Sequence, residues 1–394
     1  MPARRWPPGG EAFTPADLWG AARVGDPERE LRDALRRRLG CGDATLHASG
    51  REAMRVALGW LAKERGRDEV LIPAYTCFSI PASAIAAGLR VRLVDVTLAG
   101  RVDPRSLESL PLERAAALVV GNLFGVPEPV GALRERLSRA GVALIDDAAQ
   151  ALGARTPEGV VGARGDLGIL SFGRGKPLGA LGGGAIAWPG APALPSPPTR
   201  PRRALALAKA LAYDAALQPA VFGALAAIPA LHIGETPFEP GFVRGAIDGA
   251  SLCLAAVAER GLDARARERA RRADALAADV AAAGAFQPIV AARADVGVYP
   301  RLALVAPSAD ARDAALAALR ELGASGMYPS SLDAIAALRP HLAGEPRCPT
   351  ARELAARLLT LPTHRELRGS ERARLLEVLA TGGARVVSAR SESS

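Results

Sequence analysis

Short apolar runs alternate with amphipathic stretches over roughly the first half of the chain. Uninterrupted apolar runs of this length are typical of strands that are buried on both faces of a sheet. The strand candidates are 69–72, 91–94, 116–120, 142–145, 167–171 and 184–188. Between them, apolar residues three and four positions apart predict helices, which include 50–64 and 131–140. The alternation predicts an α/β fold in which helices cover both faces of a mostly parallel sheet.

The pattern changes after the last of these strands. A Pro-rich break at 189–201 is followed by an Ala/Leu-rich stretch, a long helical pattern over 249–283, and then mixed strand and helix signals. We therefore expect a second, smaller α+β domain at the C-terminal end. The predicted divisions are an N-terminal arm and helix over 1–40, a large domain over 41–265 with an apolar helical insert at 204–231, and a small domain over 266–390.

Bulk composition narrows the function only slightly. The chain has 394 residues, 49% apolar residues and a formal net charge of +9. Its basic runs are short and few aromatic residues lie between them, so we do not expect a nucleic-acid partner. A positive field suits an anionic substrate equally well.

The four cysteines and four histidines are scattered without metal-ligand spacing, so we expect no metal site. No secretory apolar segment follows Met1, and we expect a cytoplasmic protein with reduced thiols. The apolar insert carries charges at Lys209 and Asp214 and prolines at Pro219 and Pro229, so it should not span a bilayer. Packed helices over the mouth of the active site are the favoured interpretation. An exposed apolar lid in peripheral contact with a membrane is the alternative.

Lys176 lies in a glycine-rich loop that follows the strand candidate 167–171. It is one of three lysines in a chain whose Lys and Arg total is 50. Only a lysine amine can condense with an aldehyde, because a guanidinium stays protonated. A solvated surface lysine is the ordinary alternative. Two phosphate-loop motifs fail in this loop, because Leu170 and Pro177 break a P-loop and Leu178 breaks a dinucleotide G-x-G-x-x-G motif.

Two adjacent acids, Asp146 and Asp147, end the strand candidate at 142–145. In open α/β sheets, ligands bind at the carboxyl ends of the strands. An Asp there can keep the pyridine nitrogen of pyridoxal 5′-phosphate (PLP) protonated, and Gln150 can reach the phenolic oxygen of the ring. A pair of helix N-cap residues is the alternative for the two acids.

Four ordered motifs together resemble the DegT/StrS-type family of PLP-dependent sugar aminotransferases, which have fold type I. Residues 165–176 look like the family's G-D-x-G-x-x-S-F-x-x-x-K segment, and residues 146–150 look like its E-D-A-A-Q. Residues 49–53 are similar to S-G-T-x-A, and residues 73–76 to P-S-x-T. The resemblance covers roughly residues 45–190 and continues weakly to 361–362.

The resemblance implies a role for each matching residue. Lys176 would form the internal aldimine and move the proton, and Asp147 would pair with the pyridinium nitrogen. Contacts to the rest of the cofactor would come from Gly50, Arg51, Cys77, Gln150, Ser171 and, across a homodimer interface, Arg244. Because Arg51 opens an apolar-periodic stretch, the start of a helix there would point its amides at the phosphate.

Several positions depart from the family pattern. Arg51 replaces a common Thr, and Cys77 stands where an aromatic ring usually stacks on the cofactor, with Phe78 or Tyr75 as possible substitutes. The family's H-L-Y-G reads 122–125 here and begins with Asn122. Its N-Y-R-M reads 242–245, where only the arginine, Arg244, is kept.

The resemblance implies a homodimeric aminotransferase that moves an amine from an amino acid, glutamate being favoured, to a keto-sugar. We expect the sugar to be nucleotide-linked and to serve cell-surface polysaccharide synthesis. The retained Lys176 disfavours the family's dehydratase branch, which lacks this lysine. The alternative from another class is a non-catalytic protein that keeps the fold and the cofactor for a structural or regulatory role.

Overall fold

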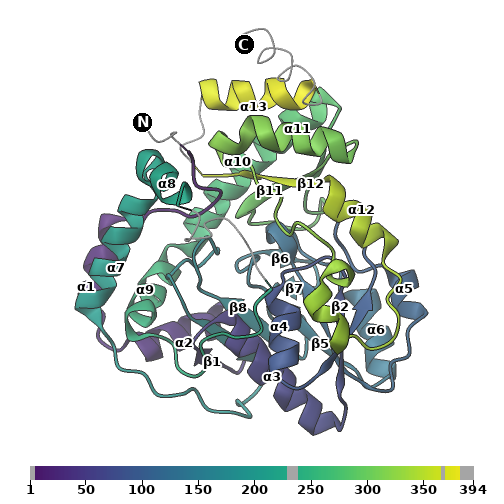
Figure 1. Cartoon of the computed structure of the whole chain (residues 1–394). Helices are drawn as coiled ribbons and strands as arrows, with labels where there is room; N and C mark the ends of the chain where they lie inside the picture. Colours follow the sequence, from purple (N-terminus) through teal and green to yellow (C-terminus); the bar gives the residue numbers. More distant parts are fainter. Residues whose placement is uncertain (1–4, 229–237, 365–368, 382–394) are drawn as a thin grey trace.

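The computed structural model describes residues 5–228, 238–364 and 369–381 (Figure 1). Its largest element is a seven-stranded sheet with the strand order β1-β9-β8-β5-β4-β2-β3. The strands are β1 (Asp43–His47), β2 (Glu69–Pro73), β3 (Arg90–Val94), β4 (Ala115–Gly121), β5 (Ala143–Asp147), β8 (Leu167–Ser171) and β9 (Gly184–Trp188). The five strands from β3 to β8 run parallel, whereas β9 is antiparallel to β8 and β1 is antiparallel to β9. The predicted mostly parallel sheet is confirmed.

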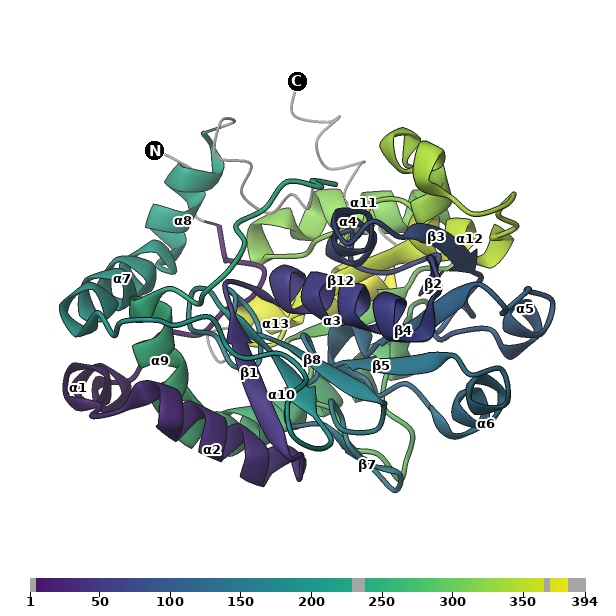
Figure 2. The same cartoon turned by 90° about the horizontal axis from the view of Figure 1, so that it is seen from below.

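Both faces of the sheet are covered by helices (Figures 1 and 2). Along β4, Ala117 and Val119 join the apolar core shared with α3 (Gly50–Arg65) and α4 (Ser79–Ala86). Leu118 and Val120 point to the opposite core, which α6 (Gly131–Arg139) closes; α5 (Pro104–Glu108) lies beside it. Successive strand residues face opposite sides of a sheet, so a strand covered on both sides reads as one continuous apolar run.

A second group of helices packs around α9 (Gly249–Arg260), which is buried almost throughout. Its neighbours are α1 (Pro15–Arg23), α2 (Pro27–Leu39) and α7 (Arg203–Ala216), and α8 (Pro219–Ala226) follows α7. The prediction of one long helix over 249–283 is wrong in one respect, because α9 ends at Gly261 and α10 (Leu262–Ala283) begins there. Gly261 has non-helical backbone angles (φ −97°, ψ 1°), a conformation that glycine adopts easily.

The C-terminal part contains an antiparallel sheet of β10 (Gln287–Ile289), β11 (Arg301–Val305) and β12 (Leu358–Pro362). Its core is shared with α10, α11 (Ala309–Leu319) and α13 (Ser370–Ala380), and α12 (Pro349–Arg357) precedes β12. The remaining short elements are β6 (Arg155–Thr156), β7 (Gly159–Val160), η1 (Leu123–Gly125), η3 (Arg320–Leu322), η4 (Leu332–Ala334) and η5 (Ala336–His341). The domain limits at 40, 265 and 390 stay predictions; residues 229–231 of the insert and 382–390 of the small domain lie outside the described residues.

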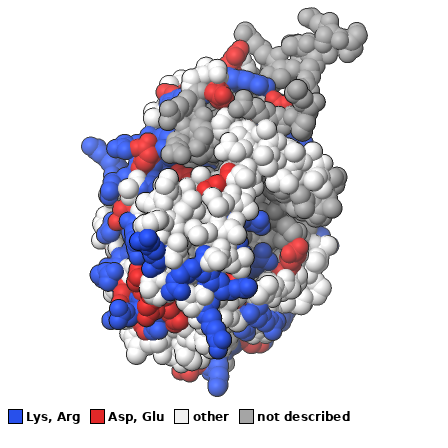
Figure 3. Space-filling view, turned by 90° about the vertical axis from the view of Figure 1, so that its left-hand side faces the viewer, with Lys and Arg blue, Asp and Glu red and all other residues white. Residues whose placement is uncertain are grey.

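The insert forms α7 and α8 at the side of the molecule where α1 lies (Figure 1). The outward face of α7 carries only apolar side chains, at Ala204, Ala208, Leu211, Ala212 and Ala215. Seen from this side, a broad uncharged surface has Lys and Arg side chains, and several Asp and Glu side chains, around it (Figure 3). Among the residues that the structure covers, no helix is long and apolar enough to cross a membrane.

Candidate functional site

The candidate site lies where the carboxyl ends of neighbouring parallel strands meet the start of α3. Cys77 follows β2, Asp147 ends β5, and Ser171 ends β8. This convergence follows from the strand order, since parallel neighbours bring their carboxyl ends to one edge of the sheet. Together with its open mouth the pocket has a volume of about 870 Å³. Its wall consists of Ser49, Gly50, Arg51, Met54, Cys77, Ser79, Ile80, Ser83, Asp147, Ala149, Ile169, Ser171, Gly173, Lys176, Gly182 and Gly183.

The start of α3 forms one end of the pocket beside Ser171. Ser49 caps the helix, and its Oγ accepts a hydrogen bond of 3.1 Å from the Glu52 amide. The chain passes so close that a Cβ on Gly50 would lie 2.8 Å from the Ser171 Cβ. Because Gly50 has no side chain, space remains beside the Ser171 hydroxyl at the first turn of α3. Helix N-terminal amides with a nearby hydroxyl are typical of a phosphate site.

Asp147 is the acid of this pocket. Its carboxylate accepts one hydrogen bond, from the Ala149 amide at 2.9 Å, and its side chain is buried. Burial raises the pKa of Asp147 to about 6, although the Ala149 amide and the positive charge of Lys176 act in the opposite direction. A carboxylate that is buried with so few donors favours a cationic partner.

Lys176 reaches the same pocket from the loop between β8 and β9. The loop turns at Gly175, which has a φ of +71°, and the Lys176 amide donates to the Gly173 carbonyl at 3.3 Å. Within the described residues, the Lys176 side-chain amine has neither a hydrogen bond nor an ion pair. The amine is therefore free to react with a ligand in the pocket.

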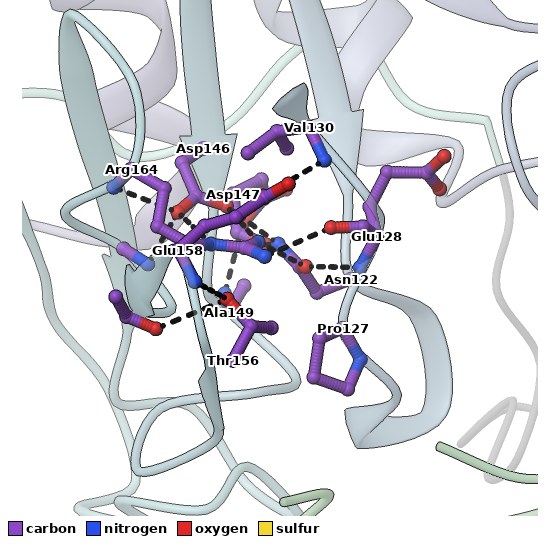
Figure 4. Close-up of polar contacts among 12 residues, drawn as sticks. Asn122, Pro127, Glu128, Val130, Asp146, Asp147, Ala149, Thr156, Glu158 and Arg164 are labelled. Atoms are coloured by element: carbon purple, nitrogen blue, oxygen red, sulfur yellow. Dashed lines mark hydrogen bonds and ion pairs between the residues drawn. The ribbon is translucent and has the colours of Figure 1, made fainter. Parts of the chain in front are cut away.

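Asp146 points the other way, into a fully buried network (Figure 4). Arg164 binds it through two parallel bonds, Nε to Oδ2 at 3.0 Å and Nη2 to Oδ1 at 2.9 Å. The amides of Gly162 and Arg164 and the side-chain amide of Asn122 donate three more bonds to the same carboxylate. All of these bonds satisfy Asp146 internally, so it is a structural residue at this strand end.

Asn122 connects this network to the pocket. Its Nδ2 donates to Asp146 Oδ1 at 2.8 Å and to the Asp147 carbonyl at 2.9 Å, and its Oδ1 accepts from Arg164 at 2.7 Å. Asp146, at the position of Glu in E-D-A-A-Q, and Asn122, at the position of His in H-L-Y-G, therefore contact one guanidinium, that of Arg164. Through these contacts the two side chains fix the end of β5 and hence the backbone of Asp147.

Gln150 does not contribute to the pocket wall, and its contact with the phenolic oxygen of the ring stays a prediction. Its Oε1 accepts from the Phe124 amide at 2.9 Å, and its Nε2 donates to the Tyr328 hydroxyl at 2.7 Å. Both partners have left-handed backbone angles, with φ of +58° for Phe124 and +53° for Tyr328. Such conformations are costly for large residues and persist where neighbouring contacts hold them. Gln150 is thus occupied in holding two strained residues.

Cys77 lies in the pocket wall, at the position where the family has an aromatic ring. Its Sγ lies 3.0 Å from the Ser79 hydroxyl. Tyr75 and Phe78, the suggested aromatic substitutes, are both buried and instead pack against the Tyr328 ring with centroid distances of 5.9 Å. The thin Cys77 side chain therefore leaves the adjacent face of the pocket uncovered.

Arg244 is exposed and does not contribute to the wall of this pocket. Its loop nevertheless lies against the start of α3, because Gly245 donates to Glu52 at 3.1 Å and its carbonyl accepts from Ala48 at 2.8 Å. In the same loop, the Phe242 ring lies 5.9 Å from the Arg51 guanidinium. The expected contact of Arg244 with a partner's phosphate stays a prediction.

Two residues of this region carried no signal in the sequence. Tyr328 is fully buried between Tyr75, Phe78 and Gln150, and burial raises its pKa well above the usual value. Arg164 is 1% exposed although it is one of many arginines. Each is defined by contacts with residues distant in sequence, so no local motif could have found them.

Among the histidines and cysteines that the structure describes, Cys77 alone contributes to the pocket wall. Burial lowers the pKa of His47 to about 4, and its Nε2 lies 3.2 Å from the Thr45 hydroxyl. All four cysteines are free thiols. Within the described ranges, no group of three or more potential ligands is placed to hold a metal ion.

Comparisons with known proteins agree with this geometry. The model of the DegT/DnrJ/EryC1/StrS aminotransferase family matches residues 14–190, which confirms the family resemblance over a segment containing Gly50, Asp147 and Lys176. The erythromycin biosynthesis sensory transduction protein EryC1 of Saccharopolyspora erythraea is 37% identical over 141 residues, covering 35% of this chain and 38% of that protein. The dTDP-3-amino-3,4,6-trideoxy-α-D-glucose transaminase of Streptomyces venezuelae is 35% identical over 147 residues, covering 37% and 38%. The matched part thus spans less than two fifths of either relative.

The likeness of the fold extends over the whole chain. Spr1654 of Streptococcus pneumoniae, in its PMP form, has a TM-score of 0.77 and 17% identity, covering 98% of this chain and 100% of that one. A structure of the same protein in a PLP form has a TM-score of 0.76. At this identity the likeness shows the fold alone. The predicted fold, that of the DegT-type aminotransferases, is confirmed.

Proposed function

We propose that this protein is a PLP-dependent aminotransferase that moves an amine from an amino acid, most simply glutamate, to a keto-sugar. The observation that carries the proposal is that Lys176 and Asp147 face one pocket whose end is formed by the start of α3. A reactive amine, a buried acid and an anion site are the three groups that this cofactor requires.

The residues of the pocket fit PLP. The close approach of Gly50 to Ser171 leaves amides and a hydroxyl for a phosphate, and a side chain at Gly50 would fill that space. Asp147 lies buried with one donor only, which suits a cationic ring nitrogen. Cys77 is thin enough to admit a planar ring beside it.

When bound, PLP supplies the electron sink for the reaction. The chain's own groups do the remaining work. Asp147 would hold a proton at the ring nitrogen, and the Lys176 amine would bind the aldehyde. Once the donor's amine displaces it, the free Lys176 amine would take the proton from the donor's α-carbon and return it to the cofactor. The α3 amides and Ser171 fix the phosphate, so that the ring keeps its orientation while the amine moves.

The proposal is tested by half-reactions on the purified, PLP-loaded protein. L-Glutamate should convert the visible absorbance of the bound cofactor to that of its amine form, with one 2-oxoglutarate released per site. A panel of nucleotide-linked keto-sugars should then restore the absorbance. A protein that binds PLP through Lys176 but transfers no amine from any donor would instead support the non-catalytic alternative.

The finer expectations belong to the same proposal. The name of the Streptomyces venezuelae relative, a dTDP-amino-sugar transaminase, supports a nucleotide-linked sugar as the acceptor. A homodimer with Arg244 near the partner's phosphate, a cytoplasmic location and a role in cell-surface polysaccharide synthesis are further parts of the proposal. Sedimentation of the loaded protein tests the dimer, and PLP retention in Arg244→Ala tests the shared site.

The apolar outward face of α7 is the observation in favour of peripheral membrane contact. The lid would consist of Leu205, Leu211, Leu217, Val221, Phe222 and Leu225. Of these, Leu211 and Val221 are exposed by 57% and 42%, whereas the others are partly buried. Contiguous apolar surface next to basic side chains is typical of anionic-lipid contact. Co-sedimentation with anionic liposomes, and its loss in Leu211→Glu, would support this part of the proposal.

A further inference from the structure

A second, smaller cavity lies on the other side of the loop 173–176. It shares Lys176 with the cofactor pocket, and the rest of its wall comes from the N-terminal arm, the loop after β8, and α1, α7, α9 and α10. Four cationic side chains contribute to its wall, against two carboxylates: Arg174, Lys176, Arg265 and Arg269, and Glu11 and Asp17. The cavity is therefore positively charged and adjacent to the reactive amine.

Arg269 is the central group of this cavity. Its side chain is 7% exposed, and its Nη2 lies 2.9 Å from the Glu11 carboxylate. Its Nη1 is buried and has no hydrogen-bond partner within the described residues. A buried guanidinium nitrogen without an acceptor is costly, and an anion that fills the place of that acceptor would be stabilised there.

Glu11 comes from an extended arm that is fixed at both ends. The Trp6 amide donates to the Glu321 carbonyl at 2.8 Å, and the Phe13 amide donates to the Asp214 side chain on α7 at 2.9 Å. Between these points the arm crosses the loop that carries Lys176. Gly10 passes so close to α7 that a Cβ would lie 2.3 Å from the Tyr213 hydroxyl, and its φ is +109°.

We infer that Arg269 binds the carboxylate of the amino-acid donor, and that Glu11 occupies this position when the arm is closed. The inference rests on the proposed function, because it assigns the donor's binding group. In an amino acid the carboxylate is bonded to the carbon that bears the amine, so it must lie close to Lys176. A sugar nucleotide carries its phosphates farther from the reacting carbon. The group that Arg269 already holds is itself a carboxylate, that of Glu11.

Binding of glutarate tests the inference without any amine transfer. Glutarate has two carboxylates and no amine, and its affinity for the PLP-loaded protein can be measured by calorimetry. Arg269→Gln should weaken binding about 10- to 100-fold, since a hydrogen-bonded charge pair is lost. Glu11→Gln should strengthen it about tenfold, because the competing carboxylate is neutralised. Gly10→Ala should do the same while Glu11 is retained, because the arm can no longer close.

Arg271→Gln is the matched control, since Arg271 lies on the same helix but is 75% exposed and pairs with Glu268 at the surface. It should leave glutarate affinity unchanged. Arg269→Lys covers the case in which Arg269→Gln does not fold, and it should bind glutarate more weakly than the wild type. Unchanged affinity in Arg269→Lys and Glu11→Gln would overturn the inference.

Inorganic phosphate serves as the second probe. Phosphate binding that equals glutarate binding, and that is lost in Arg269→Gln, would show an anion site without preference for carboxylates and would overturn the assignment. If glutarate binds as expected but glutamate transfers no amine, the carboxylate site stands and the proposed reaction is wrong. If amine transfer occurs while glutarate binding ignores Arg269 and Glu11, the reaction stands and this site is wrong.

Discussion

The end of β5 places two neighbouring carboxylates in opposite environments. Asp146 accepts five hydrogen bonds, three of them from the buried Arg164: two from its guanidinium and one from its backbone amide. Asp147 accepts one and faces an open pocket together with Lys176. Both acids are buried, so burial alone does not identify the functional one. The number of carboxylate acceptor positions that lack a donor does. Asp146, whose hydrogen-bonding positions are filled, holds the strand end in place. Asp147, which has one donor, retains affinity for a ligand.

The largest expected effect is at Lys176, on the open side. Lys176→Ala should abolish covalent attachment of the cofactor, because no other amine contributes to the pocket wall, while a loop substitution leaves the fold intact. Borohydride reduction followed by peptide mass mapping measures attachment. Lys63→Ala should behave as the wild type. Labelling of Lys63 or Lys209 in the wild-type protein would show that the assignment of Lys176 is wrong.

Asp147→Asn should retain bound cofactor but slow amine transfer by several orders of magnitude. A neutral amide cannot keep the ring nitrogen protonated, so the electron sink is lost. Single-turnover rates with glutamate provide the measurement. Asp146→Asn, in protein that remains folded, should be much milder. Equal losses in the two variants would mean that the two acids do not differ in the way the structure indicates.

Asp146→Asn should instead appear as a loss of stability. Removing one charge of a buried pair leaves Arg164 uncompensated, at a cost of about 3–5 kcal/mol. Denaturant unfolding of the cofactor-free protein measures this difference. Asp68→Asn removes the partner of Arg114 in a surface pair with 53% and 58% exposed side chains, and should leave stability close to that of the wild type. A loss of similar size in both variants would remove the distinction between the two pairs.

The elements around the end of β5 show which features the sequence predicts and which it does not. The apolar run 142–145 predicts β5 because both faces of the sheet are covered, and Gly184–Trp188 was found at its predicted bounds for the same reason. The strand Asp43–His47 and the helix Ser79–Ala86 were not predicted, since the first is short and polar at its ends and the second has Pro81 in its first turn. Six residues chosen from sequence motifs line one pocket in the structure: Gly50, Arg51, Cys77, Asp147, Ser171 and Lys176. The saturation of Asp146 could not be foreseen, because Arg164 reaches it only in the folded chain.

The pKa of Asp147 gives a prediction with the opposite sign from that for Asp146. Folding raises this pKa from its ordinary value of 3.8 to about 6, so the folded cofactor-free chain binds the proton more tightly than the unfolded chain. Stability is therefore lost as the pH rises through this range, and the charged carboxylate costs about 3 kcal/mol above pH 6. Asp147→Asn should be more stable than wild type at pH 8, and the difference should fade as the pH falls toward 4. Unfolding curves at several pH values measure this, and a constant difference would contradict the assignment.

The smallest expected effect is at Gln150. It tests whether this residue is structural, like Asp146, or binds the ligand, like Asp147. Gln150→Met conserves much of the volume but leaves the Phe124 amide and the Tyr328 hydroxyl without their partner, at a cost of about 1–3 kcal/mol. If Gln150 is structural, as its contacts indicate, stability falls while the visible spectrum of the bound cofactor stays in place. If it reaches the phenolic oxygen of the ring, as the family resemblance implies, the absorbance maximum shifts and its pH dependence changes. Gln287→Met on the exposed side of β10 is the control, which should alter stability by less than about 0.5 kcal/mol. A spectral shift without loss of stability would show that Gln150 binds the ligand, as Asp147 is proposed to do.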